Sequence, residues 1–353
     1  MSSEPFPRTI IIVGAGIFGL STALAIARRH PSTKVTVVDR LTPPVEDGTS
    51  VDTTRCIRAD YADPIYARLA AEAQRKIEQD PDLRRYYFKQ GMSFVVDGKA
   101  GRILDVWKRG LANIRRTKST SAAVEMKTPE EVYKRIHGQD VELVSEQTLG
   151  RERKWNRGYC NLEDAFIDAK ECVRIYYERC LQQPSISFEC GIAVERLCVE
   201  NGRAVGVLLE DGRNLTADLT LVAAGAWSSK LVYLEGLTLS SAIEVAWLKL
   251  TDDEVARWKD MSITTNFSTG FNIFPPYNGE IKCLRRSAGY RNTVVIPHPE
   301  DPSRSITTSL PRTVVTNPSD AIPEDAEAAL RDNLRELMPQ LADRPFDRTK
   351  LCW

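Results

Sequence analysis

The sequence predicts a mixed α/β (α+β) protein in which a Rossmann-like domain is joined to a second domain rich in β-sheet. An apolar strand at residues 9–13 runs into three spaced glycines and a helical segment, and a second apolar strand then ends at Asp39. Asn-Gly and Asp-Gly pairs separate β-rich runs between residues 186 and 217, as is typical of hairpins. A chain of 353 residues is long enough to bury the cores of two domains.

The glycine-rich segment predicts a dinucleotide-binding turn. Gly14 allows a tight turn after the strand, Gly16 lets a pyrophosphate approach the backbone, and Gly19 lets the helix pack closely on the strand. The phosphates are expected at the N-terminus of that helix, and Asp39 is expected to bond the ribose hydroxyls of the adenosine half. The alternative is a tight strand-to-helix turn that binds no ligand.

The composition narrows the class of partner. Lys plus Arg and Asp plus Glu each number 48, so we expect a small-molecule ligand and neither a nucleic-acid surface nor a membrane surface. Eight cysteines without a CxxC pair, with only three histidines, predict no metal site and no disulfide framework. This cysteine usage favours a reducing compartment. His30, His137 and His298 are expected at the surface or at helix caps rather than as catalytic bases.

The other elements follow from spacing and composition. Helical spacing predicts helices over 64–79, 100–116, 129–137, 165–182 and 324–338. β-rich runs predict strands over 88–98, 186–190, 193–200, 204–210, 214–217, 219–224, 240–250, 269–274 and 279–285. We expect the nucleotide-binding domain to consist of residues 1–60, 150–240 and 340–353, and a substrate domain to consist of residues 61–149 and 241–339.

Four parts of the chain together resemble one family. They are residues 9–40, residues 52–61, the pair 193–196 and 224–227, and residues 274–282. They resemble the FAD-dependent amine oxidases of the sarcosine, pipecolate, saccharopine and fructosyl amino acid oxidase group, within the D-amino acid oxidase superfamily. The resemblance implies FAD as the cofactor and a set of residues that bind it, namely Gly14, Gly16, Ile17, Gly19, Asp39, Arg40, Thr53, Thr54, Arg55, Val194, Gly225, Trp227 and Cys352.

The resemblance also implies three catalytic residues. Arg55 would lie against the isoalloxazine ring and stabilise reduced, anionic flavin, and Arg58 would bind the substrate carboxylate through a planar bidentate contact. Lys282 would supply the fixed positive charge that favours electron transfer to O2. The alternatives are two exposed arginines on an edge strand and a solvated lysine. No catalytic base is expected, because a deprotonated amine can deliver its hydride without one.

Cys352 resembles the family cysteine that bonds covalently to the 8α carbon of the flavin. In the family a further segment follows this cysteine, so we expect a chain truncated at its C-terminus, with part of the flavin pocket left open. The location is expected to be cytoplasmic, or peroxisomal if a C-terminal address has been lost.

The activity implied by the resemblance is oxidation of a secondary amine, an N-substituted amino acid, to an imine, with O2 reduced to H2O2. The protein is expected to be a monomer. Two alternatives stay open. One is an NAD- or FAD-dependent dehydrogenase that passes its electrons to an acceptor other than O2, and the other is a truncated, inactive paralogue that acts only as a binding protein.

Overall fold

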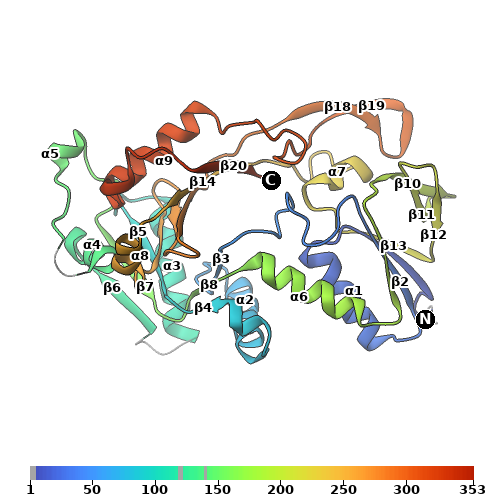
Figure 1. The fold of residues 1–353 in the computed structure, drawn as a ribbon, viewed down its shortest axis with the longest axis horizontal. Helices are drawn as coiled ribbons and strands as arrows, with labels where there is room; N and C mark the ends of the chain where they lie inside the picture. Colours follow the sequence, from blue (N-terminus) through green and yellow to red (C-terminus); the bar gives the residue numbers. More distant parts are fainter. Residues whose placement is uncertain (1–4, 118–121, 139–140) are drawn as a thin grey trace.

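The fold is mixed α/β, as predicted, with helices packed on the faces of several sheets (Figure 1). The computed structural model describes residues 5–117, 122–138 and 141–353. Within these ranges the sheets contain four, three, eight, two and three strands. Among the helices that the structure describes, none is both long enough and apolar enough to cross a membrane.

A parallel four-stranded sheet in the order β13-β1-β2-β9 forms the Rossmann-like part of the molecule. Its two central strands are short apolar runs that are largely buried, as is typical of parallel strands covered on both faces. Helices α1 and α6 cover one face, where Ile10 and Val37 pack with Leu20 and Val173. The elements are β1 (Thr9–Val13), α1 (Ile17–Arg29), β2 (Lys34–Asp39), α6 (Ala169–Leu181), β9 (Ile186–Cys190) and β13 (Leu219–Val222).

A three-stranded antiparallel sheet covers the opposite face, where Ile11 packs with Val207 and Leu209. Its strands are β10 (Val194–Glu200), β11 (Arg203–Leu209) and β12 (Asn214–Thr216). Asn201 and Gly202 join the first two with positive φ angles of 51° and 76°. A tight hairpin turn requires such angles, so the hairpin predicted from the Asn-Gly pair is confirmed.

The largest sheet has eight strands in the order β20-β14-β17-β16-β15-β5-β7-β6. Helices α4, α8 and α9 cover one face, where Leu330 and Leu334 pack with Ile281, and α3 covers the other face, where Trp107 packs with Phe94 (Figure 1). The elements are β5 (Met92–Val96), α3 (Arg102–Thr117), β6 (Ala123–Met126), α4 (Pro129–His137), β7 (Arg157–Asn161), β14 (Ile243–Lys249), α8 (Asp252–Trp258), β15 (Ile263–Asn266), β16 (Phe271–Ile273), β17 (Glu280–Arg285), α9 (Glu324–Leu337) and β20 (Arg348–Cys352).

Two strands of this sheet bear on the expected domain division, which places residues 150–240 and 340–353 in the nucleotide-binding domain. Strand β7 pairs with β5 and β6, and β20 pairs with β14. Residues 157–161 and 348–352 therefore join the larger sheet. The division as a whole stays a prediction.

The helix predicted over 165–182 is wrong in its first part. Residues 165–167 form strand β8 (Ala165–Ile167), which pairs with β3 (Arg55–Ile57) and β4 (Tyr87–Phe88). Asp168 then ends the strand and starts α6, because its carboxylate accepts a hydrogen bond from the N–H of Glu171 at 3.1 Å. Sheet pairing of the apolar residues thus outweighs the helical spacing.

The remaining elements connect these layers. Helix α2 was predicted over its observed range. These connecting elements are α2 (Pro64–Gln79), η1 (Leu83–Tyr86), α5 (Glu146–Leu149), η3 (Gly225–Trp227), α7 (Ser228–Leu231), the hairpin strands β18 (Thr293–His298) and β19 (Asp301–Ser309), and η4 (Pro339–Leu341).

The placement of His137 and His298 at the surface is wrong. Both side chains are buried. His137 does end α4, but its Nε2 lies 2.7 Å from the carbonyl oxygen of Leu337 and its Nδ1 accepts the indole N–H of Trp258 at 3.2 Å. His298 packs its ring on Tyr233, with the centroids 4.5 Å apart. The residues Leu337 and Trp258, which contact His137, and Tyr233, which covers His298, lie far from them in the sequence. The local sequence therefore does not indicate that either ring is buried.

Protonation of His137 is expected to destabilise the protein. Its Nε2–H faces a carbonyl and its Nδ1 faces an N–H donor, so a second proton would meet that donor directly. Burial lowers the pKa of His137 below its ordinary value. Below about pH 6.5 the unfolded chain then binds more protons than the folded chain, so the free energy of unfolding falls as the pH drops.

Urea midpoints measured at about pH 8 and about pH 5.5 test this expectation. The variant His137→Gln should lose part of the wild-type dependence on pH, whereas His30→Gln, at a half-buried position near the N-terminus, should retain it. An unchanged pH dependence in His137→Gln would contradict the assignment.

Candidate functional site

A glycine turn joins β1 to α1 at the carboxyl end of the parallel sheet. Gly14 has a φ of +111°, and a Cβ there would lie 2.3 Å from the carbonyl oxygen of Ala223. A Cβ on Gly19 would lie 1.9 Å from the carbonyl oxygen of Gly14. Gly16 has more room, since its Cβ would meet only the hydroxyl of Ser50, at 3.0 Å. The first and third glycines are therefore required by close backbone approach.

Replacing Gly19 by alanine is expected to lower the free energy of unfolding by about 1–3 kcal/mol or more, because the new methyl group overlaps a backbone oxygen that cannot move aside. Gly16→Ala is the matched control. Its methyl group would lie 3.0 Å from the side-chain oxygen of Ser50, a milder overlap than the one at Gly19, so it should cost clearly less. Equal losses in urea denaturation would show that the close packing of α1 on the turn is not what Gly19 provides.

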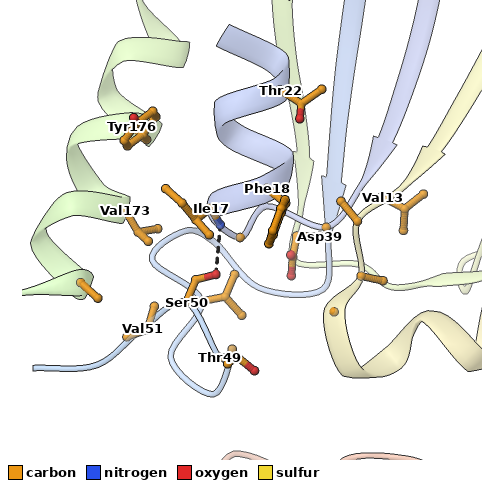
Figure 2. Close-up of a pocket in the computed structure, with 18 of the residues that line it drawn as sticks. Val13, Ile17, Phe18, Thr22, Asp39, Thr49, Ser50, Val51, Val173 and Tyr176 are labelled. Atoms are coloured by element: carbon orange, nitrogen blue, oxygen red, sulfur yellow. Dashed lines mark hydrogen bonds between the residues drawn. The ribbon is translucent and has the colours of Figure 1, made fainter. Parts of the chain in front are cut away.

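A cavity of about 1920 Å³ opens at this turn. It exceeds the roughly 300–1,000 Å³ of common small-molecule pockets and lies at the carboxyl ends of β1, β2 and β13, where open α/β sheets bind ligands. Figure 2 shows Ile17 and Phe18 at the start of α1, with the N–H of Ile17 donating to the hydroxyl of Ser50 at 3.0 Å. The predicted cofactor residues that line the cavity are Gly14, Gly16, Ile17, Asp39, Arg40, Arg55, Val194, Gly225 and Trp227.

The other predicted cofactor residues lie outside the lining of this cavity. Gly19 faces the turn itself. Thr53 and Thr54 follow the Ser50 loop, and the Thr54 hydroxyl is buried without a hydrogen-bond partner among the described residues. Cys352 lies on the edge strand β20 of the eight-stranded sheet.

Asp39 ends β2 at the wall of the cavity, as Figure 2 shows. Its carboxylate accepts hydrogen bonds from the N–H groups of Ala15 at 2.7 Å and Leu41 at 3.1 Å. Burial raises the pKa of Asp39 above its ordinary value, although these two N–H groups oppose the shift. The side chain thus holds the glycine turn in place. Its contact with a ribose stays a prediction.

Arg40 stands beside Asp39 and connects three parts of the site. It forms an ion pair with Asp47, whose side chain is buried. Its guanidinium lies over the ring of Trp227, 4.5 Å from the ring centroid. Asp47 also accepts a hydrogen bond from the hydroxyl of Thr313. Sequence reasoning missed Asp47 and Ser50 because both lie in a loop without a regular hydrophobic pattern, where no motif marks an individual polar residue.

Lys282 lies on β17 in a buried polar cluster. Its Nζ is 2.9 Å from the carboxylate of Asp52, and both side chains are only 3% exposed. The ammonium also donates to the carbonyl oxygen of Thr54 and lies 4.3 Å from the ring centroid of Phe274. The solvated-lysine alternative is therefore wrong, because the side chain is buried.

Asp52 is the residue of this cluster that sequence reasoning missed. Besides Lys282, it pairs with Arg55, whose Nε lies 3.8 Å from the Asp52 carboxylate. Burial alone would raise the pKa of Asp52, but the two cations hold it below its ordinary value. Burial in turn lowers the pKa of Lys282, and the Asp52 carboxylate opposes that shift. The ionised carboxylate of Asp52 thus pairs with two cations, Lys282 and Arg55, at the edge of the cavity.

Arg55 also reaches the end of the chain. Its Nη2 lies 3.7 Å from the sulfur of Cys352, although the two residues are far apart in sequence. Strand β20 carries the cysteine to this point by pairing with β14, in which Ile243 faces Cys352. The predicted flavin cysteine and the predicted flavin arginine are therefore in contact.

Arg58 follows β3 directly and lies outside the lining of the cavity, which Cys56 joins. Its Nη1 donates to the carbonyl oxygen of Asp60 at 2.6 Å. Its guanidinium stacks over the rings of Tyr61 and Phe94, at 4.3 and 5.6 Å from their centroids. The structure thus keeps Arg58 half-buried on aromatic rings, so the alternative of a fully exposed arginine is wrong.

Comparison with known proteins shows to which family the chain belongs. Residues 9–353 match the model of a family described as FAD dependent oxidoreductase. The chain belongs to this family. FAD is accordingly its cofactor, and the family agrees with the predicted Rossmann-like fold.

Among curated proteins, the chain is similar to the L-saccharopine oxidase of Schizosaccharomyces pombe, with 28% identity over 98% of this chain and 79% of the relative. It is also similar to the amino acid oxidase imqH of Aspergillus flavus, with 27% identity over 99% of this chain and 84% of the relative. Among solved structures, fructosamine oxidase (Amadoriase II) from Aspergillus fumigatus has a TM-score of 0.77 at 26% identity, covering 98% of this chain and 75% of that chain. Amadoriase I from the same species has a TM-score of 0.80 at 24% identity, covering 100% and 77%.

The residues present fit FAD. The cavity borders backbone at Gly14 and Gly16 that carries no side chain, so a pyrophosphate can approach the N-terminus of α1. The guanidinium of Arg55 adds a polar group where the Asp52 cluster meets the cavity. The buried, unpartnered hydroxyl of Thr54 belongs to the preceding residue, outside the lining. Such a combination of a large cavity with few polar groups is typical of cofactor sites.

Proposed function

We propose that this protein, as a monomer, oxidises a secondary amine, an N-substituted amino acid, to an imine and passes the electrons to O2, which yields H2O2. FAD supplies the group that accepts hydride from the carbon next to the amine nitrogen. The observation that carries the proposal is the burial of Lys282 against Asp52, beside the Arg55 that lines the cavity. The relatives are named as oxidases of saccharopine, of amino acids and of fructosyl amines, which supports the same reaction class.

Different elements of the chain would contact different parts of FAD. We propose that the glycine turn binds the pyrophosphate, that Asp39 and Arg40 contact the adenosine half, and that the backbone of Val194 lies by the adenine. Thr53, Thr54, Gly225 and Trp227 would complete the contacts. The positions of most of these residues along one cavity support this assignment.

The positive charges of the site have separate tasks in this proposal. Arg55 stabilises the negative charge of the reduced cofactor, and Lys282 stabilises the negative charge that forms when O2 takes up an electron. Asp52 holds Lys282 in position and keeps it protonated, because an unpaired buried ammonium would lose its proton more readily. Arg58 binds the substrate carboxylate, a role suited to a planar guanidinium held on two aromatic rings.

We also propose that Cys352 would hold FAD covalently, its sulfur replacing one hydrogen of the 8α carbon. The two protons released would go to solvent, and the two electrons would pass through the flavin to O2. The Nη2 of Arg55, a residue that lines the cavity, lies 3.7 Å from this sulfur. Protein from cells supplied with flavin should retain the yellow colour in the pellet after acid precipitation. Cys352→Ser should release the flavin into the supernatant, while Cys198→Ser, at a cysteine of β10 outside the cavity lining, should behave as wild type. Flavin that is released from the wild type would contradict the covalent bond without affecting FAD binding.

The reaction class is tested with a peroxide-coupled assay of the FAD-loaded protein. Sarcosine, pipecolate, saccharopine and a fructosyl amino acid represent the four kinds of amine that the relatives and the resemblance indicate, and the corresponding primary amino acids serve as controls. We expect peroxide from at least one secondary amine and much less from the primary amino acids. If an amine reduces the flavin but no peroxide forms, the protein would instead be a dehydrogenase. The molar mass measured by light scattering tests separately whether the protein is a monomer.

A further inference from the structure

The buried carboxylate of Asp47 has no task in the proposed reaction, but it supports a residue of the cavity wall. Its side chain is only 1% exposed, and Asp47 is not among the residues that line the large cavity. One carboxylate oxygen pairs with the guanidinium of Arg40, which does line the cavity, and the other accepts the hydroxyl of Thr313. A carboxylate held at both oxygens has one orientation, so it can fix the orientation of Arg40.

The guanidinium of Arg40 is held on two sides. The Asp47 carboxylate pairs with its Nη2, and its Cζ lies 4.5 Å from the ring centroid of Trp227. Trp227 also lines the cavity. The Arg40 side chain stays 24% exposed, so the ion pair and the ring leave part of it free to contact a ligand in the cavity. Arg40 and Trp227 thus form one stretch of the cavity wall.

The groups that hold Asp47 in place come from distant parts of the chain. Thr313 follows the hairpin strand β19, and its side chain is buried. The carbonyl oxygen of Arg312, the residue before it, accepts the indole N–H of Trp353 at 2.8 Å. The main-chain oxygen of Trp353 in turn accepts the hydroxyl of Thr49, in the same loop as Asp47. This loop is therefore attached at two points to segments outside the parallel sheet.

We propose that Asp47 is a positioning residue for cofactor binding, which holds the guanidinium of Arg40 against Trp227 so that both already form the contact surface for the adenosine half of FAD. The inference rests on the proposed contact of Arg40 with that half and names the residue that acts through it. An arginine that is free to move loses rotamer freedom when a ligand orders it, and this loss weakens binding. Asp47 and Trp227 restrict Arg40 beforehand, so less of that freedom is lost when FAD binds.

The test measures binding rather than turnover. The protein is purified from cells grown with little riboflavin, and calorimetry gives the dissociation constants of ADP and of inorganic pyrophosphate. ADP contains the adenosine half of FAD, whereas pyrophosphate lacks it. Because a change of charge near the phosphates affects both ligands, the ratio of the two constants, pyrophosphate over ADP, measures what the adenosine half contributes.

Asp47→Ala should reduce this ratio about 2- to 10-fold, the usual cost of ordering one flexible side chain. Arg40→Met should reduce it at least as much. In the Arg40→Met background, Asp47→Ala should cause little further change, because Asp47 acts through Arg40. The control Glu46→Ala removes an exposed carboxylate from the same loop, outside the cavity lining, and should keep the wild-type ratio.

Thr313→Val removes only one partner of Asp47, so it should shift the ratio in the same direction by a smaller factor, and it replaces Asp47→Ala if that variant does not fold. The inference is overturned if the ratio stays at its wild-type value, or if it falls equally with and without Arg40. An unchanged ratio in Arg40→Met overturns it too, because Arg40 would then not contact the adenosine half. The proposed amine oxidation stands in each of these cases, since the peroxide assay tests it independently.

Discussion

Lys282→Met is expected to slow reoxidation of the reduced enzyme by O2 about 10²- to 10³-fold, the loss typical when one preorganised charge is removed from a reacting centre. Reduction of the flavin by the amine should change only a few-fold, because the lysine acts on the charge that forms at oxygen. The structure supports this separation, since Lys282 is fixed by Asp52 and the carbonyl oxygen of Thr54 rather than by the region around Arg58. Stopped-flow measurement of the two half-reactions gives both rates.

The matched control is Lys249→Met, which removes an exposed lysine from β14, the strand next to β17 in the same sheet. It should leave both half-reactions as in the wild type. The role assigned to Lys282 fails if its replacement leaves the reaction with O2 unchanged. It also fails if both half-reactions slow equally, because that result would indicate a general disturbance of the flavin site.

Asp52→Ala is expected to lower the free energy of unfolding by about 3–5 kcal/mol, the usual cost of leaving one partner of a buried ion pair uncompensated. Both side chains of the Lys282 pair are almost fully buried, so water screens the interaction little. The double variant Asp52→Ala, Lys282→Met should recover a large part of the loss, because the remaining charge is removed as well. Urea denaturation of the apo-protein measures all four members of the cycle.

Asp253→Ala controls for the loss of a carboxylate, since Asp253 lies exposed in the first turn of α8. It should change the free energy of unfolding by no more than about 0.5 kcal/mol. Additive losses in the double variant would contradict the ion pair as the source of the effect. They would also remove the basis for assigning Asp52 the task of keeping Lys282 charged.

Local sequence patterns predicted the parts of the site in which neighbouring residues act together. The glycine turn, the strand that ends at Asp39 and the hairpin at Asn201 each depend on backbone conformations that a few residues specify. Residues 165–167 show the limit of this reasoning. Their spacing fits a helix, but pairing with β3 and β4 decides the outcome.

Local sequence patterns could not predict contacts between distant parts of the chain. Nothing near Asp52 indicates that its partner is Lys282, and nothing near His137 indicates Leu337 and Trp258. The register of β20 on β14 brings Cys352 to Arg55, and such registers follow from the packing of a whole sheet. The resemblance named the flavin residues individually, whereas the structure shows which of them touch.

The most direct test of the central claim is anaerobic titration of the FAD-loaded protein with a secondary amino acid, followed by admission of O2, with the flavin absorbance and H2O2 recorded together. An FAD-dependent amine oxidase predicts that the amine bleaches the flavin, that O2 restores the colour rapidly, and that one H2O2 forms for each flavin reoxidised. A flavin that stays oxidised with every secondary amine, or a reduced flavin that O2 restores only slowly and without peroxide, would contradict the account.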